Sequence, residues 1–280
     1  MKLILTSDIH LGNTFTLESP LVPPEPFDQK EHELFAAQIH AEKPDVLIVT
    51  GDCAESSMWD GHLKTFFEMY KNPHGDSICI PGNHDQWLSR PIRTTCEEKF
   101  QDFFVQATAH GWVGIKDEPW SKDGVYVAGG MGWYDYSSRN LESQQLTPEE
   151  FDEFCFFGRK WSDFGMMGMP SALAFNRLRM AEFESCMNKV PPLDQRNALI
   201  AISHFVGLSR LMVKVGAEDD FYAAFFGNFS LGKLVIEKDS DLYYCGHRHR
   251  RAEWTIGKTR CICNGSGYGR GSKRFDIVEI

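Results

Sequence analysis

Short apolar runs rich in β-branched residues recur along the chain, and they constrain its fold more than any other feature. They lie at residues 2–7, 46–50, 77–80, 125–129, 198–203, 242–245, 259–263 and 275–280. Because most of the runs lack an alternation of polar and apolar residues, they predict strands that are buried on both faces of a sheet.

Helical patterns lie between several of these predicted strands. One apolar stripe follows the i, i+3, i+4, i+7 spacing of a helix face, at Phe100, Phe103, Phe104 and Ala107. A second helix is predicted from about residue 28 to residue 42, and it stops before Pro44. Strands that alternate with helices indicate a layered α/β domain. The late strands lie close together in the sequence, which favours an antiparallel part of the sheet.

We expect a single domain over residues 1–280, since 280 residues permit one large domain or two small ones and neither a repeat nor a low-complexity linker divides them. Two segments look like additions to a minimal core. One is the proline-rich stretch 17–27, and the other is a mainly helical insert at about 134–192. Such insertions commonly form lids or binding walls, although their Met and Phe residues can also simply pack on the core.

Composition excludes several classes of protein. Hydrophobic residues make up 42% and charged residues 24%, which argues against disorder. The formal net charge of −10 makes nucleic acid an unlikely partner, since counterion release needs a dense basic face. No apolar stretch approaches the ~20 residues of a membrane span, and the apolar start is too short for a signal peptide. The eight scattered cysteines predict reduced thiols and a cytoplasmic location.

Side chains that bind metals follow the predicted strands where these end. They are Asp8, His10, Asp52, Asn83, His204, His247 and His249. Strand carboxyl ends converge on one edge of an α/β sheet, so we expect these side chains to share one cleft. Asp8 and His10 are two residues apart and are expected to point to the same side of an extended segment, as are His247 and His249. Glycines before Asp52, Asn83 and His247 permit tight turns.

This donor set indicates a pair of metal ions. Imidazole, carboxylate and amide ligands suit Mn, Fe, Zn or Ni better than Ca. Seven ligands exceed the ~3–4 protein ligands of one catalytic zinc, so two metals that share a carboxylate account for them better. A single histidine is more often structural than a ligand, and the remaining histidines lack partners in the pattern. We interpret them as structural or surface residues: His32, His40, His62, His74 and His110.

The complete series of motifs resembles the calcineurin-like metallophosphoesterase family, in the family order. It reads Asp8-x-His10, Gly51-Asp52, Gly82-Asn83-His84-Asp85, His204 and Gly246-His247-x-His249. The motif set is also similar to that of class III cyclic nucleotide phosphodiesterases. The resemblance implies a four-layer α/β/β/α sandwich with two divalent or trivalent transition-metal ions. It implies that one metal is held by Asp8, His10, Asp52 and His249. It further implies that Asp52 bridges to a second metal, completed by Asn83, His204 and His247.

The resemblance also implies the chemistry. His84 would be a non-ligand that stabilises or protonates the leaving oxygen, with Asp52 or Asp85 nearby to orient it. The expected reaction is hydrolysis of a small phosphomonoester or phosphodiester by in-line attack of a metal-bridging hydroxide. Nothing in the sequence selects a substrate-binding residue. A nuclease of the same superfamily is one alternative. A non-catalytic interaction scaffold is another, but scaffolds of this fold have lost ligands that are intact here.

Some residues near the motifs admit two interpretations. Basic residues gather between Tyr244 and Arg274, where they could recruit an anion or simply be solvated. Aromatic walls for a substrate ring are possible at Trp87, Trp133 and Tyr134, although core packing is at least as reasonable. We interpret the cysteines near the motifs as small buried hydrophobes and not as ligands: Cys53, Cys245, Cys261 and Cys263.

Overall fold

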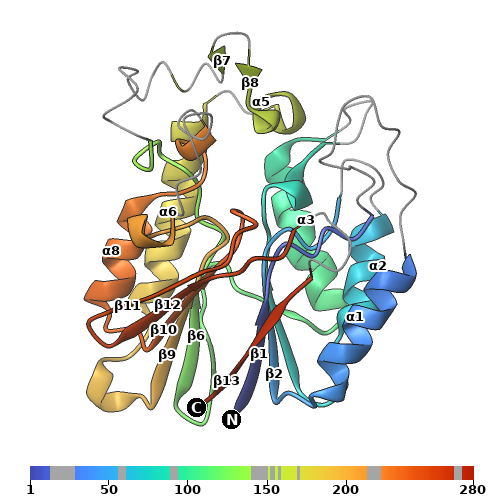
Figure 1. Cartoon of the computed structure of the whole chain (residues 1–280), viewed down its shortest axis with the longest axis vertical. Coiled ribbons are helices and arrows are strands. Elements are labelled where there is room, and N and C mark those ends of the chain that lie inside the picture. Colours follow the sequence, from blue (N-terminus) through green and yellow to red (C-terminus); the bar gives the residue numbers. More distant parts are fainter. Residues whose placement is uncertain are drawn as a thin grey trace.

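Two large β-sheets face each other in the computed structural model, with helices on their outer sides (Figure 1). The structure describes residues 1–12, 29–55, 61–88, 94–139, 151, 155–156, 159–168, 171–212, 222–267 and 273–280. The proline-rich stretch 17–27 singled out in the sequence lies outside these residues. None of the described helices combines the length and the apolar character needed to cross a membrane.

The first sheet has the strand order β13-β1-β2-β3-β4. Its strands are β1 (Lys2–Thr6), β2 (Val46–Thr50), β3 (Asp76–Ile80), β4 (Val113–Gly114) and β13 (Phe275–Glu279). Strands β1 to β4 run parallel, and β13 pairs antiparallel with β1. The outer side of this sheet is covered by α1 (Gln29–Ala41), α2 (Gly61–Tyr70) and α3 (Cys96–Ala109).

The second sheet has the strand order β11-β12-β10-β9-β6-β5. Its strands are β5 (Trp120–Lys122), β6 (Val125–Gly129), β9 (Ala198–Ile202), β10 (Leu242–Cys245), β11 (Ala252–Ile256) and β12 (Thr259–Cys263). The four central strands are parallel, and the edge strands β5 and β11 are antiparallel to their neighbours. Its outer helices are α6 (Ala172–Asn188) and α8 (Phe229–Glu237).

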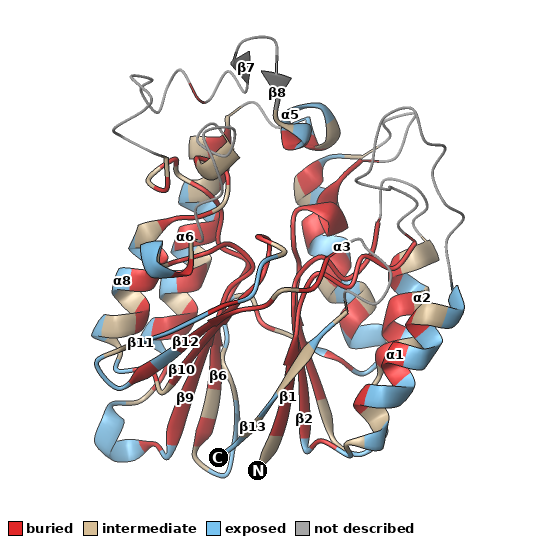
Figure 2. Ribbon diagram, in the orientation of Figure 1, coloured by how far each residue is buried: buried red, intermediate tan, exposed pale blue. Residues whose placement is uncertain are grey.

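The core confirms that the central strands are buried on both faces (Figure 2). Along β1, Leu3 and Leu5 belong to the apolar cluster between the two sheets, which also contains Ile200 and Tyr244. The intervening Ile4 belongs to a separate cluster beneath α1, α2 and α3. This alternation gives four layers in the order α/β/β/α, so the predicted fold class is confirmed.

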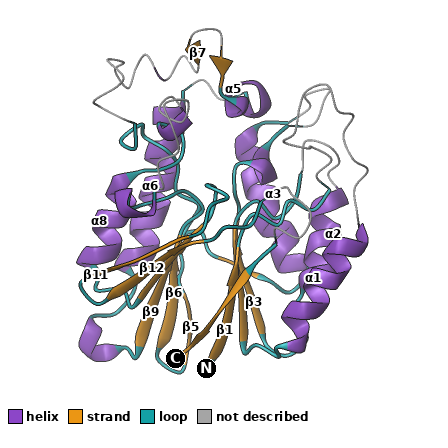
Figure 3. Cartoon of the chain, in the orientation of Figure 1, coloured by secondary structure: helices purple, strands orange, loops and turns teal. Residues whose placement is uncertain are grey.

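The strand predictions agree with the structure to within a residue at each end. The short strands β4 and β5 and the edge strand β11 were not predicted, because their sequences are brief or largely polar. The described part of the 134–192 insert contains α6, the short helix α5 (Ser162–Met167) and the two-residue strands β7 (Cys155–Phe156) and β8 (Arg159–Lys160). Loops leave the carboxyl ends of the strands of both sheets and meet between the sheets (Figure 3). Side chains on these loops can therefore form a site there.

Candidate metal centre

Loops after five parallel strands bring the seven predicted ligands together. Strands β1, β2 and β3 of the first sheet are followed by Asp8, His10, Asp52 and Asn83. Strands β9 and β10 of the second sheet are followed by His204, His247 and His249. All of these side chains are buried except His249, which is partly exposed. The site therefore lies between the sheets, and each sheet supplies part of it.

The backbone reaches this arrangement through left-handed conformations. The φ angles are 54° at Asp8, 48° at His10, 50° at Asp52, 66° at His247 and 54° at His249. Residues other than glycine rarely adopt positive φ, and such strain concentrates at functional sites. The expectation that each pair lies on an extended segment was therefore wrong. The pairs converge because the chain coils tightly after each strand, and not because an extended strand places alternate side chains on one side.

Close approach of the loops explains two of the neighbouring glycines. A side chain at Gly82 would collide with the backbone and carboxylate of Asp52, and one at Gly246 would collide with Ser7 and Asp8. Gly51 additionally has a φ of 92°, which L side chains rarely adopt. These glycines let the loops of the first and second sheets pack against one another at the site.

The first group of donors gathers around His10. Its Nε2 lies 3.1 Å from Nε2 of His249 and 3.5 Å from Oδ2 of Asp52. Nε2 of His249 lies 3.2 Å from Oδ1 of Asp8. One potential ligand atom from each of these four residues lies within 4.8 Å of the others. They are the four residues predicted to hold the first metal.

The second group gathers around His204. Its Nε2 lies 3.4 Å from Oδ1 of Asp52 and 3.1 Å from Oδ1 of Asn83. Potential ligand atoms of Asp52, His204 and His247 lie within 4.8 Å of one another. Asp52 thus belongs to both groups, with Oδ2 directed to His10 and Oδ1 directed to His204. This is the arrangement that a carboxylate shared by two cations requires.

Hydrogen bonds from the far side of each ring leave lone pairs for a cation. Nδ1 of His10 bonds Glu55 over 2.8 Å, and Nδ1 of His204 bonds the carbonyl of Thr50 over 2.9 Å, so in both neutral rings Nε2 carries the lone pair. In His247 the roles are reversed, because Nε2 bonds the carbonyl of Phe225 over 3.2 Å and Nδ1 remains. Buried Oδ2 of Asp52 has no hydrogen-bond partner in the described part of the chain. This donor set fits transition-metal ions.

The electrostatics also call for positive charge at the second group. Burial lowers the pKa of His204, but Asp52 and Asp8 outweigh this effect and raise that pKa to about 9. Burial raises the pKa of Asp52, but His204, His84 and His10 hold it well below its ordinary value. A proton or a cation beside the buried carboxylates therefore stabilises their negative charge, and a metal ion at this position would do so.

Glu55 is a site residue that the sequence interpretation missed. Besides His10, its carboxylate bonds Nδ1 of His84, at 2.8 and 3.0 Å from its two oxygens. The orienting partner expected for His84 was Asp52 or Asp85. Instead, the carboxylate of Asp85 accepts the backbone N–H groups of Gly82, Cys53 and Ala54, while that of Asp52 accepts the backbone N–H of His84. An acid three residues after Asp52, in the same loop, was the available signal.

Residues 1–251 match the family model described as calcineurin-like phosphoesterase. The chain belongs to this family. The match spans all the motif blocks, so the resemblance drawn from them is confirmed. A search of curated proteins found no match.

Solved structures share the fold of this calcineurin-like phosphoesterase at low sequence identity. Phosphopantetheinyl hydrolase of Mycobacterium tuberculosis is 17% identical, with a TM-score of 0.66 over 95% of this chain and 89% of the other. A dimetal phosphatase from Danio rerio is 12% identical, with a TM-score of 0.55 over 94% and 86%. A purple acid phosphatase from yellow lupin (Lupinus luteus) is 14% identical, with a TM-score of 0.52 over 100% and 46%. The family and these phosphatase folds indicate a hydrolase.

The aromatic residues beside the motifs divide into two kinds. Trp133 and Tyr134 are fully buried and pack on Phe205, and Trp133 also packs on Phe175 of α6, which agrees with the core-packing interpretation. Trp87, by contrast, lies over the ring of His84, with ring centroids 3.6 Å apart, and its Nε1 donates to Asp163 over 2.8 Å. Asp163 lies in the insert and belongs to no sequence motif, so the sequence interpretation did not find it.

The described cysteines near the motifs behave as apolar residues. Cys53, Cys245, Cys261 and Cys263 are fully buried free thiols in the two apolar clusters. Burial raises the pKa of Cys53 well above its ordinary value, which disfavours the thiolate that a metal would need. These contacts agree with the packing interpretation.

Three of the basic residues near the carboxyl end pair with acidic neighbours. Arg251 pairs with Asp276 and Glu253, and Arg260 also pairs with Glu253. Lys258 pairs with Asp241. These pairs favour a solvated pair of strands over an open anion-binding surface; Arg270 lies outside the described residues.

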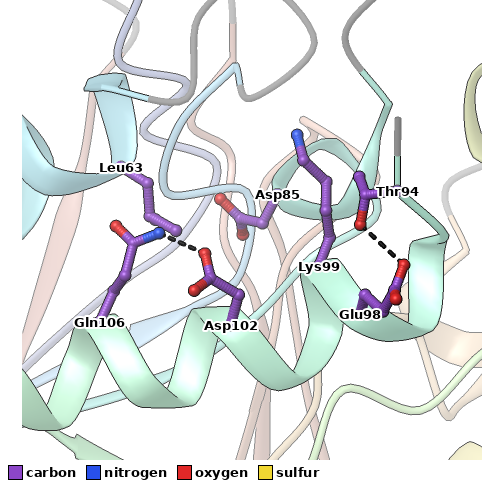
Figure 4. A pocket seen from close by; sticks show the side chains of 7 residues that line it. All are labelled: Leu63, Asp85, Thr94, Glu98, Lys99, Asp102 and Gln106. Carbon is purple, nitrogen blue, oxygen red and sulfur yellow. Dashed lines mark hydrogen bonds between the residues drawn. The ribbon is translucent and has the colours of Figure 1, made fainter. Parts of the chain in front are cut away.

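A pocket of about 430 Å³ lies beside α3. It is lined by Leu63, Asp85, Thr94, Glu98, Lys99, Asp102 and Gln106 (Figure 4). Its lining includes none of the predicted ligands.

Proposed function

We propose that this calcineurin-like phosphoesterase is a dinuclear-metal hydrolase of a small phosphomonoester or phosphodiester. The observation that carries the proposal is the position of Asp52. Its two carboxylate oxygens point to two different groups of buried donors, which lie on either side of it. A carboxylate between two groups of donors can bind one cation through each oxygen, which supports the assignment of two metals.

The first metal would be held by Asp8, His10, Asp52 and His249, and the second by Asp52, Asn83, His204 and His247. The mixed donors suit Mn, Fe, Zn or Ni. When bound there, two such ions would supply a clamp for a phosphate group, a lower pKa for a water molecule and positive charge for the phosphate oxygens.

The part of this chain in the reaction centres on His84. Glu55 accepts a hydrogen bond from Nδ1 of His84, which leaves Nε2 on the side of Asp52, at 3.9 Å from its Oδ2. Burial lowers the pKa of His84, but Glu55 and Asp52 outweigh it and raise that pKa to about 9. His84 can therefore carry a proton at Nε2 near neutral pH and donate it to a leaving oxygen, as a general acid.

The proposal is tested by metal-restored hydrolysis. The full chain is treated with a chelator, supplied with Mn²⁺ and assayed on p-nitrophenyl phosphate and bis-p-nitrophenyl phosphate. We expect activity to return with the metal, and the ratio of the two rates to distinguish monoester from diester preference. Two bound metals without activity on either ester would favour the interaction-scaffold alternative or a narrow natural substrate.

The bridging role is tested with Asp52→Asn. Because the amide has one oxygen where the carboxylate has two, this change should weaken both metal sites, with manganese content falling from two ions per chain to below one. Asp241→Asn is a suitable control. The carboxylate of Asp241 accepts hydrogen bonds from the backbone N–H of Leu199 and from Nζ of Lys258, directly before β10 and at the strand end away from the centre. Two firmly held ions in Asp52→Asn would contradict the bridging assignment.

A further inference from the structure

One short segment of the insert, residues 161–167, contacts both halves of the candidate metal centre. On the side of the first sheet, the carbonyl of Met166 accepts the backbone N–H of Leu88 over 2.7 Å. On the side of the second sheet, Trp161 stacks on Phe225, with ring centroids 4.8 Å apart and planes 11° apart. The carbonyl of Phe225 in turn bonds the predicted ligand His247. Figure 1 places α5 of this segment beyond the carboxyl ends of the strands.

Within this segment Asp163 is fully buried and accepts three N–H groups. Its Oδ1 accepts from Nδ2 of Asn83 over 3.0 Å and from Nε1 of Trp87 over 2.8 Å. Its Oδ2 accepts from Nε1 of Trp161 over 2.6 Å. Burying a carboxylate is costly, and hydrogen bonds to neutral donors offset that cost only in part. An apolar residue would serve packing better, so the carboxylate indicates a role other than stability.

The bond from Asn83 to Asp163 decides which end of the amide faces the centre. An asparagine side chain has an oxygen that can bind a cation and an NH₂ group that cannot, and the two ends are nearly equal in shape. Asp163 has only acceptors to offer, so the NH₂ group of Asn83 must turn toward it. Oδ1 of Asn83 then points the opposite way, to within 3.1 Å of Nε2 of His204, in the group predicted to hold the second metal.

The same carboxylate also fixes a neighbour of His84. Trp87 donates the N–H of its indole ring to Asp163, and that ring lies against the ring of His84. We propose that Asp163 is a positioning residue: it turns the oxygen of Asn83 toward the second metal, holds Trp87 against His84, and so couples docking of segment 161–167 to assembly of that metal site. This inference rests on the dinuclear hydrolase proposed above.

The test compares Asp163→Ala with the double variant Asn83→Asp/Asp163→Ala. Without Asp163 the amide of Asn83 is free to turn, whereas an aspartate at position 83 has an oxygen at either end and needs no orienting partner. Each chelated full-length chain is titrated with Mn²⁺ by calorimetry, and spin-coupled manganese pairs are counted by electron paramagnetic resonance. The matched control is Glu182→Ala, which removes a partly buried carboxylate of α6, in the same insert, that pairs with Arg179 and Lys116.

We expect the Kd of the second Mn²⁺ to rise about 10–100-fold in Asp163→Ala, the usual effect of losing an orienting partner, while the first stays unchanged. The double variant should bind the second ion more tightly than Asp163→Ala, and Glu182→Ala should match the wild type. An unchanged Kd in Asp163→Ala would overturn this inference but not the proposed function. The same holds if the double variant binds the second ion no more tightly than Asp163→Ala. A wild-type chain that binds no second ion would overturn the proposed function as well.

Discussion

Glu55 shows how one buried carboxylate can serve two histidines with different predicted roles. It bonds Nδ1 of His10, a predicted ligand, and Nδ1 of His84, the predicted general acid. Burial raises the pKa of Glu55, but His84 and His10 outweigh it and lower that pKa to about 2. The ionised carboxylate of Glu55 therefore keeps a proton on Nδ1 of each ring. Nε2 of His10 can then bind a cation, and Nε2 of His84 can carry the proton that a general acid donates.

His84→Ala separates these two roles. Because His84 belongs to neither donor group assigned to a metal, the variant should retain two manganese ions per chain while turnover falls about 10²–10⁴-fold, the usual contribution of a general acid. Metal analysis and p-nitrophenyl ester hydrolysis on the same preparation check this expectation. Loss of both ions from His84→Ala would argue that its role is structural.

His32 should make the fold sensitive to acid. It is buried, its Nδ1 bonds the hydroxyl of Tyr70, and burial, with smaller effects of Lys273 and His10, lowers its pKa from 6.5 to about 3. Below pH 6.5 the unfolded chain takes up a proton that the folded chain does not, so stability is complete above pH 6.5 and is lost progressively down to about pH 3. At pH 5.5 the loss is about 1.4 kcal/mol.

The check is urea unfolding of the metal-free wild type and of His32→Gln at pH 7.5 and 5.5. Glutamine does not titrate, so the wild type should lose about 1.4 kcal/mol more than His32→Gln between the two pH values. Equal losses in the two proteins would show that His32 is protonated in the folded state.

At the scale of elements, the sequence predicted what depends on local pattern and missed what depends on contacts between distant segments. The sequence predicted β2 and β12 with their observed bounds, because each apolar run ends at the position where the chain leaves the sheet. The seven predicted ligands were recognised because each follows a strand. Asp163 was not found, because nothing in the local sequence of the insert indicates that it folds back onto Asn83, 80 positions earlier.

Helix α3 begins with a capping box that local sequence does account for. The hydroxyl of Thr95 accepts the backbone N–H of Glu98, and the side chain of Glu98 accepts the backbone N–H of Thr95. Thr95→Ala should lower the free energy of unfolding by about 1 kcal/mol. Thr108→Ala, at an exposed position in the last turn of the same helix, should be neutral or slightly stabilising. Urea unfolding compares the two, and equal effects would contradict the importance of the cap.

For the molecule as a whole, the candidate centre is a junction between two sheets. Asp8, His10, Asp52 and Asn83 follow strands of the first sheet, and the three remaining predicted ligands follow strands of the second. A metal ion bound across this junction would stabilise the folded chain, since the unfolded chain offers no such site.

Chelation should therefore lower the melting temperature. At a free metal concentration of one hundred times Kd, binding contributes about 2.7 kcal/mol, and about 2–4 °C per kcal/mol for a chain of this size gives a shift of about 5–10 °C. Thermal melts with and without chelator measure it. Asp52→Asn should show a much smaller shift, and an equal shift in both proteins would mean that the stabilising metal binds elsewhere.

The left-handed loops at the predicted ligands restrict which residues these positions can accept. Five predicted ligands have positive φ angles. Asp and His are among the non-glycine residues that adopt this conformation most often, whereas a β-branched residue there is a strained outlier. A substitution to valine, isoleucine or threonine at any of these positions would therefore strain the backbone as well as remove a donor atom, so the conformation of the chain and the chemistry of the site select the same residue types.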